Sequence, residues 1–250
     1  QARRLRQANR ADEYRRGQQT ELVFGESLAG VREQLARITT ADRRLSGPLP
    51  PVLIEGETGT GKTAIARWIH RHGPRADDPL VELNCSALPE ALAEAELFGH
   101  ERGAFTGANV ARQGYLESAT GGTVLFDEVG ELSSAMQVKL LRVIETRSIH
   151  RVGSVVSRPL DVRFLAATLR DLPSAVAAGT FREDLYFRLS GITLRIPPLR
   201  ARADDLAAAV HEHEIEAARE RSTGRRIFVD AQLGHREVHV GRTVAVARGQ

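Results

Sequence analysis

A glycine-rich octapeptide is the segment of this chain whose residue types and spacing point to the most specific chemistry. Residues 56–63 read GETGTGKT, follow a short apolar run and match the pattern GxxxxGK[ST]. Glycines let backbone N–H groups surround phosphate oxygens, and the following helix adds its positive N-terminal end. The predicted phosphate-binding loop comprises Gly56, Glu57, Thr58, Gly59, Thr60, Gly61, Lys62 and Thr63. Lys62 is expected to neutralise the β- and γ-phosphates, and the Thr63 hydroxyl to ligate Mg²⁺.

Lysine is otherwise almost absent from the chain. Its only lysines are Lys62 and Lys139, whereas Lys and Arg together number 35. A compact ammonium on a flexible stem fits beside phosphates where a planar guanidinium does not. The placement of one of the two lysines in the octapeptide therefore favours a functional role for Lys62.

A second acidic motif follows an apolar run. Residues 123–128 read TVLFDE, which predicts a buried strand that ends in two carboxylates. Asp127 is expected to hold Mg²⁺, and Glu128 to orient or deprotonate the attacking water. Alone, two such acids are as typical of an ordinary turn; the upstream phosphate loop favours the catalytic interpretation.

Between these motifs lies the hexapeptide GAFTGA. It comprises Gly103, Ala104, Phe105, Thr106, Gly107 and Ala108. Two glycines with a single aromatic residue make a poor core segment, so we expect an exposed tip that contacts a partner. The alternative is that Phe105 is a buried aromatic side chain.

Four motifs together resemble a known family. GETGTGKT, ELFGHERGAFTGA, GGTVLFDE and FREDLYFRL occur in the order found in the AAA+ domain of bacterial sigma-54-dependent transcriptional activators. The resemblance covers about residues 22–202. It implies an ATP- and Mg²⁺-dependent ring ATPase, usually a hexamer, that remodels the closed promoter complex of sigma-54 RNA polymerase. In that family the GAFTGA loop contacts sigma-54, which points to Phe105 and Thr106.

The resemblance also assigns roles outside these motifs. Asn84 matches a switch asparagine that links Glu128 to loop movement, although an asparagine at a strand end is otherwise a turn former. Arg182 and Arg188 match arginine fingers that act on a neighbouring subunit's nucleotide. Six residues of helix separate their directions by about 120°, so one is expected to act in trans and the other to pair within its own subunit. Ser148–Pro159 corresponds to the family's second surface loop.

The sequence departs from the family pattern at two places. The strand Val162–Thr168 matches the sensor I strand, but Leu169 replaces the asparagine that normally follows Thr168, which leaves only the Thr168 hydroxyl. The lid region also lacks the WPGN-type segment that carries the sensor II arginine; Arg236 is a weak candidate. We interpret residues 199–250 as a partial or divergent helical lid, whose tail is truncated, divergent or frame-shifted.

Strand and helix patterns alternate along the chain. Expected strands are Val52–Glu55, Leu80–Leu83, Thr123–Phe126, Val162–Ala167 and Ile192–Ile196. Expected helices are Ser27–Ile38, Lys62–His72, Leu88–Phe98, Ser134–Thr146, Asp171–Ala178, Arg182–Leu189 and Asp204–Arg221. The alternation predicts an α/β fold, an AAA+ P-loop NTPase in which helices flank a central parallel sheet, with a small lid.

Composition narrows the function classes. No apolar run is long enough for a membrane span, and the lone cysteine, Cys85, fits a reducing cytoplasm and a small buried residue rather than a reactive thiol. The formal charge of +3 is small, and the basic excess lies at the two ends. Residues 1–21 are expected to form a linker or signalling segment and 22–198 the α/β subdomain. Contact with DNA is expected only through domains absent from this chain, which does not begin with Met and is interpreted as a fragment.

Alternative functions remain open from the sequence. One is a nucleotide-dependent binding and assembly module with little or no turnover, because the sensor residues are atypical. Another is a generic AAA+ remodeller of another protein or of DNA. Metal binding by the C-terminal histidines is disfavoured, since no cysteine accompanies them and His211 and His213 point to different helix faces.

Overall fold

The computed structural model describes residues 24–88 and 90–202 of the chain. They belong to one compact unit, Thr20–His211. The expected linker (1–21), the helix expected at 204–221 and most of the expected lid lie outside the described residues.

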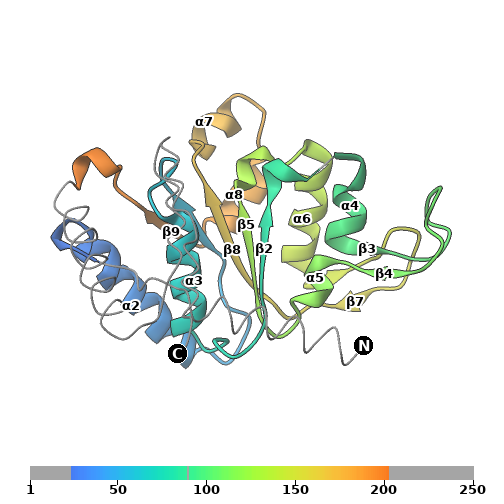
Figure 1. The fold of residues 1–250 in the computed structure, drawn as a ribbon, viewed down its shortest axis with the longest axis horizontal. Coiled ribbons are helices and arrows are strands. Elements are labelled where there is room, and N and C mark those ends of the chain that lie inside the picture. Colours follow the sequence, from blue (N-terminus) through green and yellow to red (C-terminus); the bar gives the residue numbers. More distant parts are fainter. Residues whose placement is uncertain (1–23, 89, 203–250) are drawn as a thin grey trace, which may run out of the picture. The chain divides into compact units, whose positions relative to one another are not determined.

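A five-stranded parallel sheet forms the centre of this unit (Figure 1). Its strands, in spatial order, are β2 (Leu80–Asn84), β5 (Thr123–Asp127), β8 (Arg163–Thr168), β1 (Val52–Glu55) and β9 (Ile192–Arg195). Each expected strand is present with ends that differ by no more than a residue. Because all strands run parallel, the residues that follow β1, β5 and β8 meet at one edge of the sheet.

Both faces of the three central strands β5, β8 and β1 are buried, and alternate residues of each of these strands enter different cores. In β5, Val124 and Phe126 join one cluster, whereas Leu125 joins the other. In β1, Leu53 likewise joins the first cluster, whereas Val52 and Ile54 join the second on the other face of the sheet. This period of two, with apolar residues on both sides, is typical of parallel strands that helices cover on each face.

Helices cover both faces of the sheet. α2 (Ala29–Arg44) and α3 (Lys62–His72) lie on one side, and α4 (Glu90–Phe98), α5 (Tyr115–Ser118) and α6 (Ser134–Thr146) on the other (Figure 1). α7 (Leu172–Ala177) and α8 (Glu183–Leu189) follow β8. Single-turn 3₁₀ segments are η1 (Glu26–Leu28), η2 (Cys85–Ala87), η3 (Val129–Glu131) and η4 (Leu199–Ala201). The helix expected at 27–38 extends to Arg44, because Ile38, Thr39 and Asp42 continue its buried stripe.

Two short antiparallel hairpins were not expected from the sequence. β3 (Gly99–His100) pairs with β4 (Arg112–Gln113), and β6 (Ser148–Ile149) pairs with β7 (Arg158–Pro159). Strands of two residues are too short to show a hydrophobic period. At the base of the first hairpin the two backbone segments approach each other very closely, since a Cβ on Gly114 would lie 2.3 Å from the Gly99 nitrogen. This pair of glycines therefore allows the hairpin that carries residues 103–108.

A buried ion pair ties α2 to the sheet. Asp42 Oδ2 lies 3.0 Å from an Arg163 guanidinium nitrogen, and the two side chains are only 2–3% exposed. Burial lowers the pKa of Arg163 to about 10. Burial also raises the pKa of Asp42, and the charge of Arg163 opposes that shift. Within the described part of the chain, no helix combines the length and apolar character that crossing a membrane requires.

We predict that Asp42→Ala lowers the free energy of unfolding by about 3–5 kcal/mol, because it leaves the Arg163 guanidinium buried without its counter-charge. Glu33→Ala is the matched control, since Glu33 lies on the same helix in an ion pair with Arg37 that is 67–74% exposed. The control should cost about 0.5 kcal/mol or less. Urea unfolding of both variants checks this; equal losses would contradict it.

Candidate active site

The phosphate-loop residues lie between β1 and α3, as the sequence predicts. Gly59 and Gly61 have φ of +78° and +92°, a region that favours glycine. Gly61 is the N-cap of α3, so the loop leads directly into a helix N-terminus. Lys62 is 6% exposed, and its ammonium donates to the carbonyls of Gly56 (2.9 Å) and Glu57 (3.2 Å). The loop is thus arranged around one buried cation.

The acidic pair lies beside this loop. Thr63 Oγ1 donates to Asp127 Oδ2 at 3.0 Å, which joins the first turn of α3 to the end of β5. Lys62 Nζ lies 3.4 Å from Glu128 Oε1. A hydroxyl and a carboxylate at this spacing offer the hard oxygen ligands that Mg²⁺ prefers, so the residues present fit that ion.

Glu128 has an unusual backbone and two partners. Its φ of 53° and ψ of 50° place it in the left-handed region, which non-glycine residues rarely adopt. The sequence showed no substitute for the missing sensor I asparagine amide. In the structure the backbone N–H of Leu169 donates to Glu128 Oε2 at 3.0 Å. The end of β8 therefore still holds Glu128, through a main-chain donor that any residue except proline supplies.

Thr168 and Asn84 make other contacts. Thr168 is fully buried, and its hydroxyl accepts a hydrogen bond from the Arg170 N–H. Asn84 lies opposite Asp127 in the β2–β5 register, but its side-chain oxygen accepts from the backbone and hydroxyl of Ser86. No hydrogen bond between Asn84 and Glu128 occurs in the described structure. The sensor and switch roles of these two residues stay predictions.

The two candidate arginine fingers are exposed and paired within the chain. The prediction that both lie on one helix is wrong, because Arg182 is the extended N-cap residue and α8 begins at Glu183. Gln137 Oε1 accepts from the Arg182 N–H at 2.8 Å and fixes this cap. The angle of about 120° that a continuous helix predicts therefore does not describe the directions of the Arg182 and Arg188 side chains. Arg182 pairs with Asp184 at 2.7 Å, and Arg188 with Glu145 at 3.1 Å.

The GAFTGA segment (residues 103–108) forms the loop between β3 and β4. The N–H of Gly103 donates to Ala108 O at 2.8 Å, and the N–H of Ala108 donates to Phe105 O at 3.0 Å. Phe105 is 40% exposed, so the buried-aromatic alternative is wrong; its ring packs edge-on against His100 with centroids 5.0 Å apart. Figure 1 shows this loop extending away from the sheet beside the β6–β7 loop.

The second surface loop (residues 148–159) supports the GAFTGA segment. A Cβ on Gly153 would lie 2.9 Å from the Ala104 Cβ, so the two loops touch. Arg151 donates a bidentate pair of hydrogen bonds to the Glu117 carboxylate (2.8 and 2.9 Å). Arg151 and Arg158 both donate to Glu101 Oε1. Sequence reasoning missed this four-residue cluster because its members come from separate loops and α5.

Known proteins identify the class. The fold is that of AAA+ P-loop NTPase domains; NtrX from Brucella abortus, solved in complex with ATP, matches 83% of this chain with a TM-score of 0.68 and 32% identity. The protein-family model described as the sigma-54 interaction domain matches residues 23–195 of this chain. The chain therefore belongs to the sigma-54 interaction domain family.

Curated relatives support this membership. The Nif-specific regulatory protein of Azotobacter vinelandii is 48% identical over 199 residues, which cover 80% of this chain and 38% of the relative. The nitric oxide reductase regulator NorR of Salmonella paratyphi C is 59% identical over 155 residues, 62% of this chain and 31% of that protein. The chain thus spans less than half the length of these relatives.

Cys85 is a buried neighbour of the acidic pair. It is 6% exposed, which confirms the expectation of a small buried residue. Burial raises the pKa of its thiol to about 12, and the negative charges of Asp127 and Glu128 act in the same direction.

We therefore predict that iodoacetamide leaves Cys85 of the folded chain almost unmodified at pH 8, because the thiolate is depleted by roughly 10³-fold relative to an exposed cysteine. The same reagent should alkylate it fully in denaturant, and mass spectrometry measures both. Rapid alkylation of the folded chain would show that this core is open.

Proposed function

We propose that this chain is the ATP-hydrolysing domain of a sigma-54-dependent transcription activator, which uses nucleotide turnover to remodel sigma-54 RNA polymerase through its GAFTGA loop. One observation carries the proposal: Thr63 contacts Asp127 and Lys62 contacts Glu128. The same chain presents Phe105 and Thr106 on a projecting loop. Family membership supports the choice of partner.

The contacts suggest how the residues act on ATP. The glycine-rich backbone and the start of α3 bind the phosphates, and Lys62 exchanges its carbonyl and carboxylate partners for phosphate oxygens. Thr63 and Asp127 would hold Mg²⁺, which supplies positive charge against the phosphates. Glu128, released from Lys62, accepts the proton of the attacking water while the bond between the γ-phosphorus and the bridging oxygen breaks.

Oligomerisation supplies the remaining charge in this proposal. Arg182 and Arg188 are exposed, and each pairs with a solvent-accessible carboxylate. Because exposed ion pairs contribute little free energy, either arginine can leave its carboxylate for another anion at small cost. In a ring, we infer, one of them leaves its own carboxylate and contacts the γ-phosphate in the neighbouring subunit. A hexamer is the arrangement that the resemblance implies.

A second candidate function is a nucleotide-dependent binding module without turnover. The contacts of Glu128 favour this candidate, because one of its carboxylate oxygens lies near Lys62 and the other accepts a hydrogen bond from the Leu169 N–H. If nucleotide binding does not release that carboxylate, ATP controls assembly and is not hydrolysed.

Steady-state phosphate release separates the two candidates. We expect Glu128→Gln to retain ATP binding and to lose about 10²-fold or more in turnover, because the amide cannot accept the proton. Glu33→Gln, an exposed carboxylate on α2, is the matched control and should leave turnover unchanged. Wild-type turnover indistinguishable from that of Glu128→Gln would leave only the binding module.

A further inference from the structure

A cavity of about 540 Å³ lies outside the nucleotide site, between α4, α6 and the second surface loop. Phe98 of α4 and Val143 of α6 line it as buried apolar residues. Val152 and Val155 contribute the loop side. A cavity of this size and mixed lining is typical of a ligand site.

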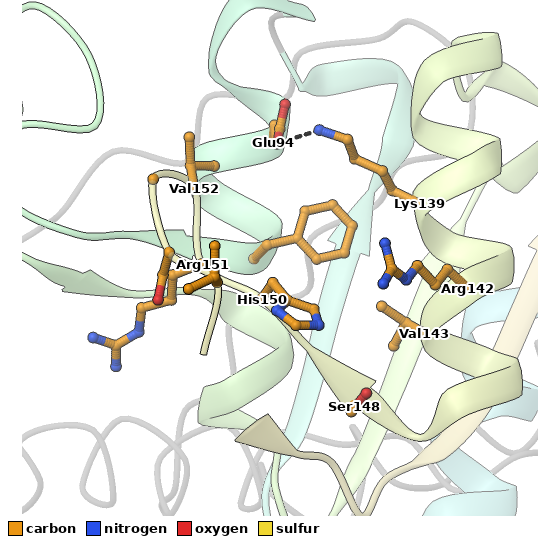
Figure 2. Close-up of a pocket in the computed structure, with 12 residues that line it drawn as sticks. Glu94, Lys139, Arg142, Val143, Ser148, His150, Arg151 and Val152 are labelled. Atoms are coloured by element: carbon orange, nitrogen blue, oxygen red, sulfur yellow. Dashed lines mark ion pairs between the residues drawn. The ribbon is translucent and has the colours of Figure 1, made fainter. Parts of the chain in front are cut away.

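Cationic side chains converge on this cavity. Figure 2 shows Arg142 directed from α6 toward the space that His150 also faces, and Lys139 extending to Glu94 across it. Among the described residues, neither the Arg142 guanidinium nor the His150 ring has a hydrogen-bond or ion-pair partner. Of the described residues that line the cavity, Glu94 alone is a carboxylate, and Lys139 already pairs with it. The lining therefore offers the unpaired Arg142 guanidinium and the polar His150 ring beside the apolar side chains of Phe98 and Val143.

The cavity is continuous with the GAFTGA surface. Its loop wall is residues 152–155, and Gly153 of that wall touches Ala104. Val155 is 95% exposed and the adjacent Val156 is 57% exposed, so this wall presents apolar side chains to solvent. Arg151 fixes the wall from the other side through Glu117. A protein segment resting on Phe105 can thus continue over Val155 into the cavity.

We propose that this cavity binds an acidic, partly apolar peptide segment of sigma-54, the protein that the GAFTGA loop contacts in the proposed function, on which this inference rests. A carboxylate of the segment pairs with Arg142 and His150, and an apolar side chain packs on Phe98 and Val143. Val155 covers the segment where it enters.

Binding of purified sigma-54 to the full chain tests the proposal, with ADP and aluminium fluoride present as the ATP transition-state analogue. Arg142→Glu should raise the Kd about tenfold or more at low salt, less at high salt, because it replaces a charge-assisted contact by repulsion. Arg44→Glu makes the same charge change at an exposed position of α2 and should leave the Kd unchanged. Arg142→Ala should show a smaller loss than Arg142→Glu.

The outcomes separate this proposal from the proposed function. Thr106→Ala tests the GAFTGA contact itself. Loss of binding in Thr106→Ala with unchanged binding in Arg142→Glu would overturn the cavity and leave the proposed function standing. No binding by the wild-type chain would overturn both. Equal losses in Arg142→Glu and Arg44→Glu would show a non-specific charge effect and overturn the cavity.

A photo-cross-linker gives an independent readout that does not depend on charge. p-Benzoylphenylalanine in place of Val155 should cross-link to sigma-54, and peptide mapping should identify an acidic segment. A cross-link to a second copy of this chain instead would assign the cavity to a subunit contact and overturn the proposal.

Discussion

The contact between Lys62 and Glu128 is the interaction on which the rest of the site depends. It brings the lysine that we propose binds phosphate within 3.4 Å of the carboxylate that we propose activates water. The two belong to segments far apart in the chain, and only the parallel order β5–β8–β1 places their strand ends at one edge. Their mutual attraction also neutralises a cation that is 6% exposed, so a phosphate that binds Lys62 must replace the charge that Glu128 provides. In the proposed function, nucleotide binding and the release of Glu128 from Lys62 are therefore one event.

The position of Glu128 also explains how the site is held although Leu169 replaces the asparagine of the family pattern. A side-chain amide is absent there, but the backbone N–H at the end of β8 donates to Glu128. The sheet that aligns the phosphate loop thus also restrains the carboxylate, and the left-handed backbone of Glu128 is held by contacts on both sides. From β2 the chain continues through η2 and α4 directly to β3 and the GAFTGA loop. β5, which ends in Asp127, pairs with β2 along its whole length, so the acidic pair lies beside the strand from which the chain leads to the GAFTGA loop.

Much of this arrangement could be predicted from the sequence. The five strands and the helices Lys62–His72 and Ser134–Thr146 have strong apolar patterns, and the phosphate loop has a specific spacing. Local pattern could not place Arg182 outside its helix, because a distant Gln137 side chain fixes that cap. It could not show the Leu169 N–H as a donor, since every residue but proline has one. The cluster of Glu101, Glu117, Arg151 and Arg158 forms only after three segments fold together.

In the proposed function, phosphate binding replaces Glu128 as the partner of Lys62. A crystal structure of this chain with Mg²⁺ and a non-hydrolysable ATP analogue tests it most directly. We expect that Lys62 Nζ contacts β- and γ-phosphate oxygens and that Thr63 and Asp127 face the metal. We also expect that Glu128 has separated from Lys62 and faces the γ-phosphate. Nucleotide bound with the Lys62–Glu128 contact intact, or bound away from residues 56–63, would contradict it.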